Sequence, residues 1–150
     1  MPPIASRKFP VLSTRRLTLR AATPRDVPAF QAMLSAPDVT RFSNWPDKIS
    51  TAQVERSMRW MAKVHSSGKG CAWIIEISGS KALAGAIRFN SFEKKWRCGQ
   101  IGYELHPSDR VLEKSGFRYE GTLRQKAWFK GAFHDFRMFG RVAGDAASAN

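Results

Sequence analysis

The chain has 150 residues, a length that suits one domain built around a single hydrophobic core. Hydrophobic residues make up 43% and charged residues 25%, a balance that excludes a largely disordered or collagen-like chain. Twenty-five Lys and Arg against twelve Asp and Glu leave a formal charge of +13, which favours acidic partners such as nucleic acid or phosphate-bearing molecules. No apolar run approaches the ~18 residues of a membrane-spanning helix, and the opening residues lack the apolar stretch of a secretory signal, so we expect a cytoplasmic protein.

The two cysteines, Cys71 and Cys98, lie in predicted strands. Neither has a neighbouring Cys or His at the spacing of metal ligands. We therefore expect two reduced, buried thiols, with no disulfide and no metal site.

The first third of the chain predicts a strand followed by two helices. Residues 14–20 alternate apolar and polar side chains, the pattern of a half-buried strand. Thr23 and Pro24 then form a helix start, and apolar residues at helical spacing continue to Pro37. A second helix begins after the capping-box sequence at Ser50 and ends near residues 66–68.

The middle of the chain predicts an antiparallel meander with strands at 71–77, 82–89 and 97–105. Side chains alternate across a sheet, so Tyr103 and Leu105 share one face and Glu104 points to the other. After this meander, Ser108 can cap a short helix that Gly116 ends.

The last third predicts a long hairpin with strands at 117–130 and 133–142 about a turn at Gly131-Ala132. We expect one domain over 1–150, with an N-terminal extension at 1–12 and a flexible tail at 143–150.

Four segments of the chain, taken together and in this order, carry a family resemblance. They are Thr14-Arg15-Arg16-Leu17-Thr18-Leu19-Arg20, Phe42-Ser43-Asn44-Trp45-Pro46, Ile101-Gly102-Tyr103-Glu104-Leu105-His106-Pro107 and Arg110-Val111-Leu112-Glu113-Lys114-Ser115-Gly116-Phe117. The chain resembles the GNAT superfamily over residues 13–142, and more narrowly its branch of ribosomal-protein alanine N-acetyltransferases. This resemblance implies an α+β (α/β GNAT-like) fold with a mostly antiparallel central sheet flanked by helices.

One stretch departs from the family pattern. The resemblance implies a glycine-rich loop, a long helix and a parallel strand before Arg110, but only Ser108 and Asp109 lie between Pro107 and Arg110. The difference is roughly 40 residues at ordinary element lengths. We therefore expect a fold that lacks one helix, one strand and the loop that binds the pyrophosphate of acetyl-CoA. The strand ending at Leu105 then has an open edge, which predicts a homodimer or an unstable monomer.

The resemblance implies transfer of an acetyl group from acetyl-CoA to a primary amine, with a protein N-terminus, as in ribosomal protein acetylation, as the candidate acceptor. Glu104 is the candidate general base, and an ordinary surface carboxylate is the alternative. Ser108 is the candidate acid near the departing thiolate, and a helix N-cap is the alternative.

The resemblance also implies positions for the two substrates. Tyr103, Leu105 and His106 are the candidate cofactor-binding residues at the end of the strand. Asn44 and Trp45 border the candidate acceptor groove, and the alternative for Trp45 is an aromatic side chain that anchors its loop to the core.

Two other classes of function compete with an enzyme. The gap after Pro107 favours a catalytically inactive or internally deleted remnant of the fold. The charge and the basic, aromatic hairpin favour a module that binds RNA or the ribosome. We do not expect nucleic acid as the partner, because alternation on a hairpin turns aromatic side chains inward and charged ones outward.

Overall fold

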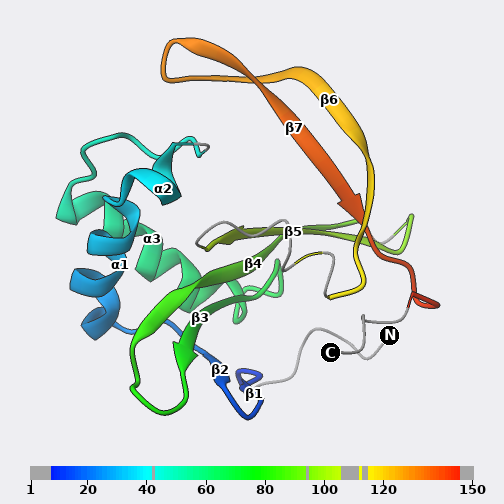
Figure 1. The fold of residues 1–150 in the computed structure, drawn as a ribbon. Helices are drawn as coiled ribbons and strands as arrows, with labels where there is room; N and C mark the ends of the chain where they lie inside the picture. Colours follow the sequence, from blue (N-terminus) through cyan, green and yellow to red (C-terminus); the bar gives the residue numbers. More distant parts are fainter. Residues whose placement is uncertain (1–7, 42, 94, 106–111, 113–114, 146–150) are drawn as a thin grey trace.

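The computed structural model describes residues 8–41, 43–93, 95–105, 112 and 115–145 (Figure 1). Five strands form one sheet in chain order, with every neighbouring pair antiparallel. They are β1 (Leu12–Ser13), β2 (Leu17–Arg20), β3 (Ala72–Ile77), β4 (Leu83–Glu93) and β5 (Cys98–Glu104). The predicted mixed fold with a mostly antiparallel sheet is confirmed.

The first predicted strand is divided by a turn. The Thr14 hydroxyl oxygen accepts hydrogen bonds from the backbone N–H groups of Arg16 and Leu17, at 3.3 and 3.0 Å. The strand therefore begins only at Leu17, and the residues before the turn return as β1, where Leu12 pairs with Leu19. Prediction of one strand over 14–20 is wrong at its first half, because a threonine that bonds to nearby backbone favours a turn.

Three helices and one 3-10 turn precede β3: η1 (Pro24–Asp26), α1 (Val27–Leu34), α2 (Pro37–Thr40) and α3 (Thr51–Val64). The predicted capping box at α3 is confirmed, since the Ser50 hydroxyl accepts from Gln53 N and the Gln53 side chain accepts from Ser50 N. Pro37 ends the first predicted helix and also opens α2, a short helix that the sequence did not indicate.

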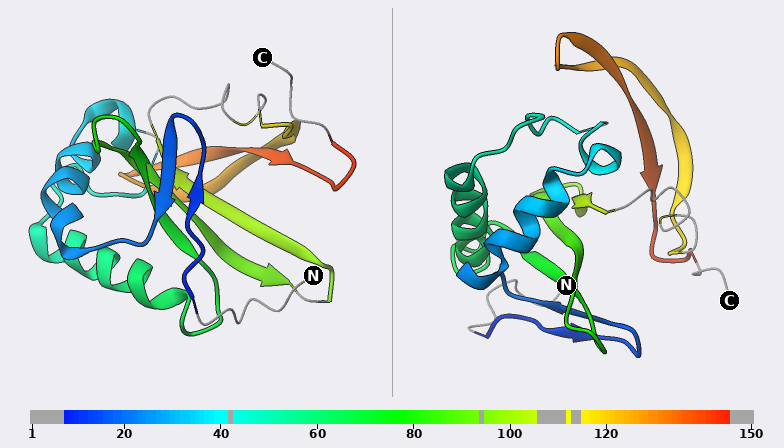
Figure 2. Two further views of the ribbon diagram at one scale, coloured as in Figure 1. Left: turned by 90° about the horizontal axis from the view of Figure 1, so that it is seen from below. Right: turned by 60° about the vertical axis from the view of Figure 1, so that its left-hand side comes forward.

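The helices lie together on one side of the sheet (Figure 2). Val54, Met58 and Met61 recur at helical spacing on α3, and all three are buried. They pack with Phe30 of α1 and Ile74 of β3 in one core cluster. Full burial of such a side chain contributes about 1.5–3 kcal/mol, so this seam holds the helices to the sheet.

The C-terminal hairpin forms a separate two-stranded sheet of β6 (Arg118–Phe129) and β7 (Ala132–Gly140). Lys130 and Gly131 have φ of 51° and 75°, the paired positive values that a tight hairpin turn requires. The predicted turn at Gly131-Ala132 is therefore one residue late. Figures 1 and 2 show the hairpin standing away from the five-stranded sheet.

The predicted helix from Ser108 and the candidate site residues His106 and Ser108 lie outside the described residues. Gly116 has a φ of 82°, the left-handed conformation expected where a helix ends. Among the helices that the structure describes, none is long and apolar enough to cross a membrane.

Candidate functional site

Glu104 is the last residue of β5 and is buried, with 7% of its surface exposed. It pairs across the strands with Ala86, a core residue beneath the helices. The Glu104 side chain therefore points to the helix-covered face of the sheet. The alternative in which this carboxylate lies on an open surface is wrong.

Two side chains from other elements hold the Glu104 carboxylate. Arg88 of β4 donates from Nη1 to Oε1 at 2.6 Å and also contacts Oε2. Trp45, in the loop after α2, donates from Nε1 to Oε1 at 3.3 Å. The structure thus brings together Glu104 and Trp45, which the sequence analysis placed at one site for different reasons.

The strand register explains why Arg88 reaches Glu104. Arg88 pairs with Gly102, which stands two residues before Glu104 on the same face of β5. A Cβ at Gly102 would lie 2.7 Å from Nδ2 of Asn90, so a larger residue there would require the Asn90 side chain to move. Asn90 Oδ1 in turn accepts from Arg88 Nε at 3.0 Å. The guanidinium is therefore fixed on two sides, toward Glu104 and toward Asn90.

Trp45 also contacts the hydrophobic core, in addition to its hydrogen bond with Glu104. It is half-buried and packs against the core cluster beneath the helices. Its role as an aromatic anchor of the loop is confirmed by this packing, and the same side chain reaches the carboxylate. Its neighbour Asn44 is exposed.

The other face of β5 carries the candidate cofactor residue Tyr103, and the candidate Leu105 follows directly after the strand; both are half-buried. Among the described residues no strand pairs with the outer edge of β5, which is the last strand of the sheet. An unpaired edge presents backbone N–H and C=O groups in a row. An extended molecule could therefore lie along this edge.

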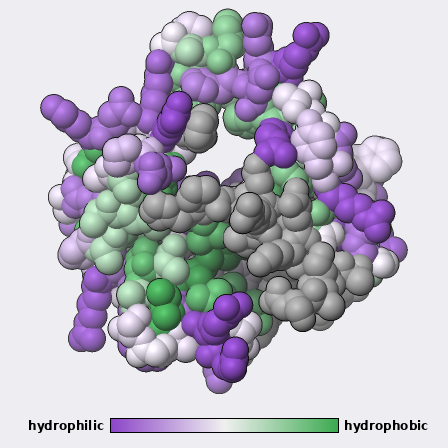
Figure 3. Space-filling view, viewed as in Figure 1, coloured by the Kyte–Doolittle hydropathy of each residue, from purple (hydrophilic) through white to green (hydrophobic). Residues whose placement is uncertain are grey.

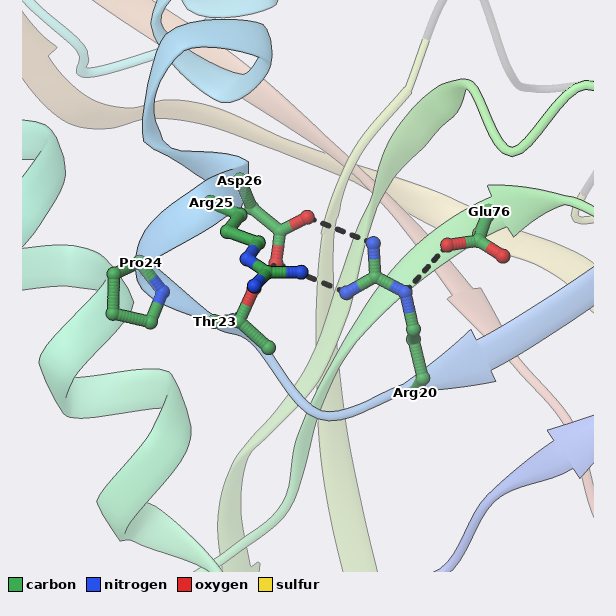
Figure 4. Close-up of a pocket in the computed structure, with 6 residues that line it drawn as sticks. All are labelled: Arg20, Thr23, Pro24, Arg25, Asp26 and Glu76. Atoms are coloured by element: carbon green, nitrogen blue, oxygen red, sulfur yellow. Dashed lines mark hydrogen bonds and ion pairs between the residues drawn. The ribbon is translucent and has the colours of Figure 1, made fainter.

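A second polar cluster joins β2, η1 and β3 and lines a shallow pocket (Figure 4). Arg20 donates to Asp26 through Nη2 at 2.8 Å and to Glu76 through Nε at 2.6 Å. The Thr23 backbone N–H and hydroxyl donate to the Asp26 carboxylate at 2.8 and 2.9 Å. Arg20, Asp26 and Glu76 each have a partner within the cluster, so we interpret these three residues as a brace between elements.

The charged side chains of this brace shift one another's pKa values. Burial raises the pKa of Asp26, but hydrogen bonds from Arg20 and Thr23 outweigh it and leave that pKa below its ordinary value. The hydrogen bond from Arg20 is the main reason why the pKa of Glu76 is also lowered. The hydrogen bond to Asp26 in turn raises the pKa of Arg20.

The cysteines differ from expectation. Both are free, but only Cys71 is buried, and Cys98 at the start of β5 is exposed. Burial raises the pKa of the Cys71 thiol to about 11. Among the described residues, no group of three or more His, Cys, Asp or Glu could hold a metal ion.

Sequence reasoning missed Arg88 altogether. A signal was present, because Arg88 stands two residues after Ala86 in a predicted strand and so shares its buried face. A cation on a buried face needs an acid partner, and Glu104 on the next strand is the nearest candidate by register.

Comparison with known proteins agrees with this architecture. Residues 16–129 match the model of the acetyltransferase (GNAT) domain. The uncharacterized N-acetyltransferase YoaA of Bacillus subtilis is 28% identical, over 89% of this chain and 97% of its own length. Since 89% of 150 residues is about 134 and the alignment spans 172 positions, about 38 positions (172 minus 134) have no counterpart in this chain.

Solved structures share the fold. The ribosomal L7/L12 alpha-N-protein acetyltransferase RimL, in complex with coenzyme A, has a TM-score of 0.68 and 19% identity, covering 89% of this chain and 98% of that one. An acetyl transferase from Salmonella typhimurium that modifies the N-terminal serine of ribosomal protein L7/L12 has a TM-score of 0.71 and 18% identity, covering 89% and 99%. The match of the domain model to most of the chain, on a fold of this form, makes the protein a member of the GNAT acetyltransferase family.

Proposed function

We propose that this protein transfers the acetyl group of acetyl-CoA to a primary amine, and that the acceptor is a protein N-terminus. The observation that carries the proposal is the buried Glu104 carboxylate at the end of β5, held beside the Trp45 loop. Family membership supports the reaction class, and solved relatives named for acetylation of ribosomal protein N-termini support the acceptor. We accordingly place its action in the cytoplasm, where ribosomal proteins are found.

The described residues fit the acyl end of the cofactor. The open edge of β5 offers backbone groups to an extended chain, with Tyr103 and Leu105 as the side chains beside it. We assign His106, which lies outside the described residues, to the same site. Bound acetyl-CoA supplies the acetyl group and a thiolate leaving group.

Residues of this chain would then carry out the proton transfers that the reaction needs. An α-ammonium group titrates near pH ~8, so most acceptor molecules must lose a proton before they can attack. Glu104 is the proposed base that accepts this proton. Arg88 and Trp45 bind three of the lone-pair directions of its carboxylate, and among the described residues the fourth, on Oε2, has no donor.

Three further roles remain proposals. Ser108 would donate a proton to the departing thiolate. Asn44, exposed beside Trp45, would contact the acceptor peptide. Arg88 is a positioning residue that orients Glu104.

The experiment uses mass spectrometry to follow acetylation of a peptide with a free N-terminal alanine, in the presence of acetyl-CoA. An N-terminally blocked copy of the peptide is the negative control. Loss of a general base typically slows a reaction by about 10²- to 10⁴-fold, so Glu104→Gln should lower kcat/KM by that factor. Glu55→Gln is the matched control, because Glu55 is an exposed acid on α3 whose partner Arg59 lies 3.7 Å away. Equal activity of Glu104→Gln and the natural sequence would remove Glu104 from the mechanism.

A second candidate is a remnant of the fold that has lost turnover. The roughly 38 alignment positions without a counterpart in this chain support it. Absence of acetyl transfer from a folded protein would favour this candidate over the enzyme.

We also propose a homodimer through the open edge of β5. A second copy would pair there in competition with acetyl-CoA, without displacing any strand of the described sheet.

A further inference from the structure

The β6–β7 hairpin exposes aromatic side chains that the sequence pattern predicts to face inward. Trp128, Phe133 and Tyr119 are 63%, 58% and 51% exposed. Prediction of an inward aromatic face is therefore wrong. The reason is that the hairpin stands away from the sheet and has no core of its own to cover (Figure 2).

Contacts between the hairpin and its surroundings concentrate at its two ends. At the tip, the Lys130 ammonium donates to the Thr40 carbonyl at 2.8 Å and lies 2.6 Å from an Asp47 carboxylate oxygen. At the base, Arg118 pairs with Asp145 at 3.2 Å. Figure 3 shows the hairpin as a bridge above an opening, with hydrophobic and hydrophilic residues interleaved along it.

Four aromatic residues form two pairs on one face of the hairpin, three of them exposed and Phe139 half-buried, whereas the exposed Phe136 lies on the other face. Trp128 pairs with Phe133, with ring centroids 4.8 Å apart, and Tyr119 pairs with Phe139, with centroids 5.6 Å apart. Phe133 and Phe139 stand an even number of residues apart on β7, so they share a face and lie about 20 Å from each other at strand spacing. Two aromatic platforms thus lie along a single strip, and the Arg137 guanidinium lies over the rings of the second, 5.2 Å from the Tyr119 centroid and 5.2 Å from the Phe139 centroid.

Cations lie between the two platforms. Arg124 and Lys126 are exposed on β6, and among the described residues neither forms an ion pair. The nearby acid Asp135 accepts from Gln125 N at 2.8 Å. Over residues 118–141 the sequence holds six Lys and Arg against two acids, Glu120 and Asp135. The hairpin is therefore both aromatic and cationic along its length.

We propose that this hairpin binds single-stranded nucleic acid. Aromatic platforms stack on bases of any sequence, and interleaved cations neutralise the phosphates between them. The charge of +13 over the whole chain draws the same partner toward the surface. A second copy of this chain fits the hairpin less well, because the buried centres of protein interfaces are depleted of charge and each copy would carry the same +13.

The test is fluorescence anisotropy with a labelled 12-nucleotide single-stranded RNA at 50 and 200 mM salt. The aromatic double variant Trp128→Ala/Phe133→Ala should bind at least tenfold more weakly than the natural sequence. The cationic double variant Arg124→Gln/Lys126→Gln should reduce the slope of log affinity against log salt by about 1.4, since each phosphate contact contributes about 0.7 for single strands.

Matched controls come from α3. Trp60→Ala removes an aromatic that is 44% exposed, and Arg56→Gln/Lys63→Gln removes two exposed cations. Neither control should change binding by more than twofold. Circular dichroism verifies that each variant folds.

Three outcomes would overturn the proposal. One is no anisotropy change with folded protein at 50 mM salt. Another is equal loss of affinity in the hairpin variants and the α3 controls, which would indicate attraction by net charge alone. The third is a fall in molar mass when Trp128 and Phe133 are replaced, measured by light scattering without RNA, which would identify a second copy as the occupant.

Discussion

At the scale of single residues, the pair of Arg88 and Glu104 decides what the end of β5 can do. A carboxylate that is 7% exposed is costly to bury alone, and the guanidinium of Arg88 provides the opposite charge and the hydrogen bonds. Trp45 adds a third contact from a separate loop. The same carboxylate thus serves stability and is available for the proposed proton transfer.

Removal of one partner from this pair should be more harmful than removal of both. We predict that Arg88→Met lowers the free energy of unfolding by about 3 kcal/mol, because it leaves the Glu104 charge buried without its cation. The double variant Arg88→Met/Glu104→Gln should recover at least half of that loss. Urea denaturation of the two single variants and the double variant measures the coupling. Additive losses would show that the two side chains do not depend on each other.

The two thiols should differ in reactivity. Burial raises the pKa of Cys71 to about 11, so its reactive thiolate is scarce at pH 8, whereas Cys98 is exposed. We predict that a thiol reagent labels one cysteine of the native protein and two in denaturant. A Cys98→Ser variant should lose the native labelling, and continued labelling of that variant would contradict the burial of Cys71.

At the scale of elements, sequence patterns predicted most helices and strands but not how those elements pair and pack against one another. The capping box and apolar spacing predicted α3 nearly to its ends, because both signals are local. The partner of Glu104 could not be predicted in the same way, since it depends on the register of β4 with β5, and that register shifts between Phe89 and Ser91. Exposure of the hairpin aromatics depends on whether another element covers them. A local sequence pattern cannot predict such tertiary packing.

The brace of Arg20, Asp26 and Glu76 should make stability sensitive to acid. Hydrogen bonds and the charge of Arg20 lower the pKa values of Asp26 and Glu76 in the folded state. The unfolded chain therefore takes up protons first as pH falls below ordinary carboxyl values of about 4, and the stabilisation present at neutral pH is lost as pH falls through the folded pKa values.

Thermal unfolding at pH 6 and at pH 3 tests this brace. We predict a fall in Tm toward pH 3 that is clearly smaller in Asp26→Asn, which lacks one of the titrating groups. Asp38→Asn on α2 is a control, because Asp38 lies outside the brace and its replacement should leave the pH dependence unchanged. The same pH dependence in Asp26→Asn and the natural sequence would exclude Asp26 as a source of the effect.

At the scale of the whole molecule, an open sheet edge and a large positive charge act against each other. The outer edge of β5 favours pairing with a second copy, and a charge of +13 on each copy opposes it. Salt screens that repulsion, with a Debye length of about 10 Å at 0.1 M. We predict a dimer whose share, measured by light scattering, rises with protein concentration and with salt.

A charge placed on the edge strand should prevent this association. Ile101→Lys on β5 is expected to give a monomer, whereas Val142→Lys, at a site 68% exposed after β7, should not change the molar mass. RNA binding by the hairpin should weaken with salt while the dimer strengthens, so the two associations can be told apart. A monomer at every concentration and salt would contradict pairing at the β5 edge.

The proposed activity requires that the chain binds acetyl-CoA despite the short connection between Pro107 and Arg110. Calorimetric titration of the folded protein with acetyl-CoA measures this directly. The proposal predicts saturable binding in the micromolar range, retained in Glu104→Gln because that carboxylate acts on the acceptor amine. No heat of binding at millimolar acetyl-CoA, from protein that circular dichroism shows to be folded, would contradict it.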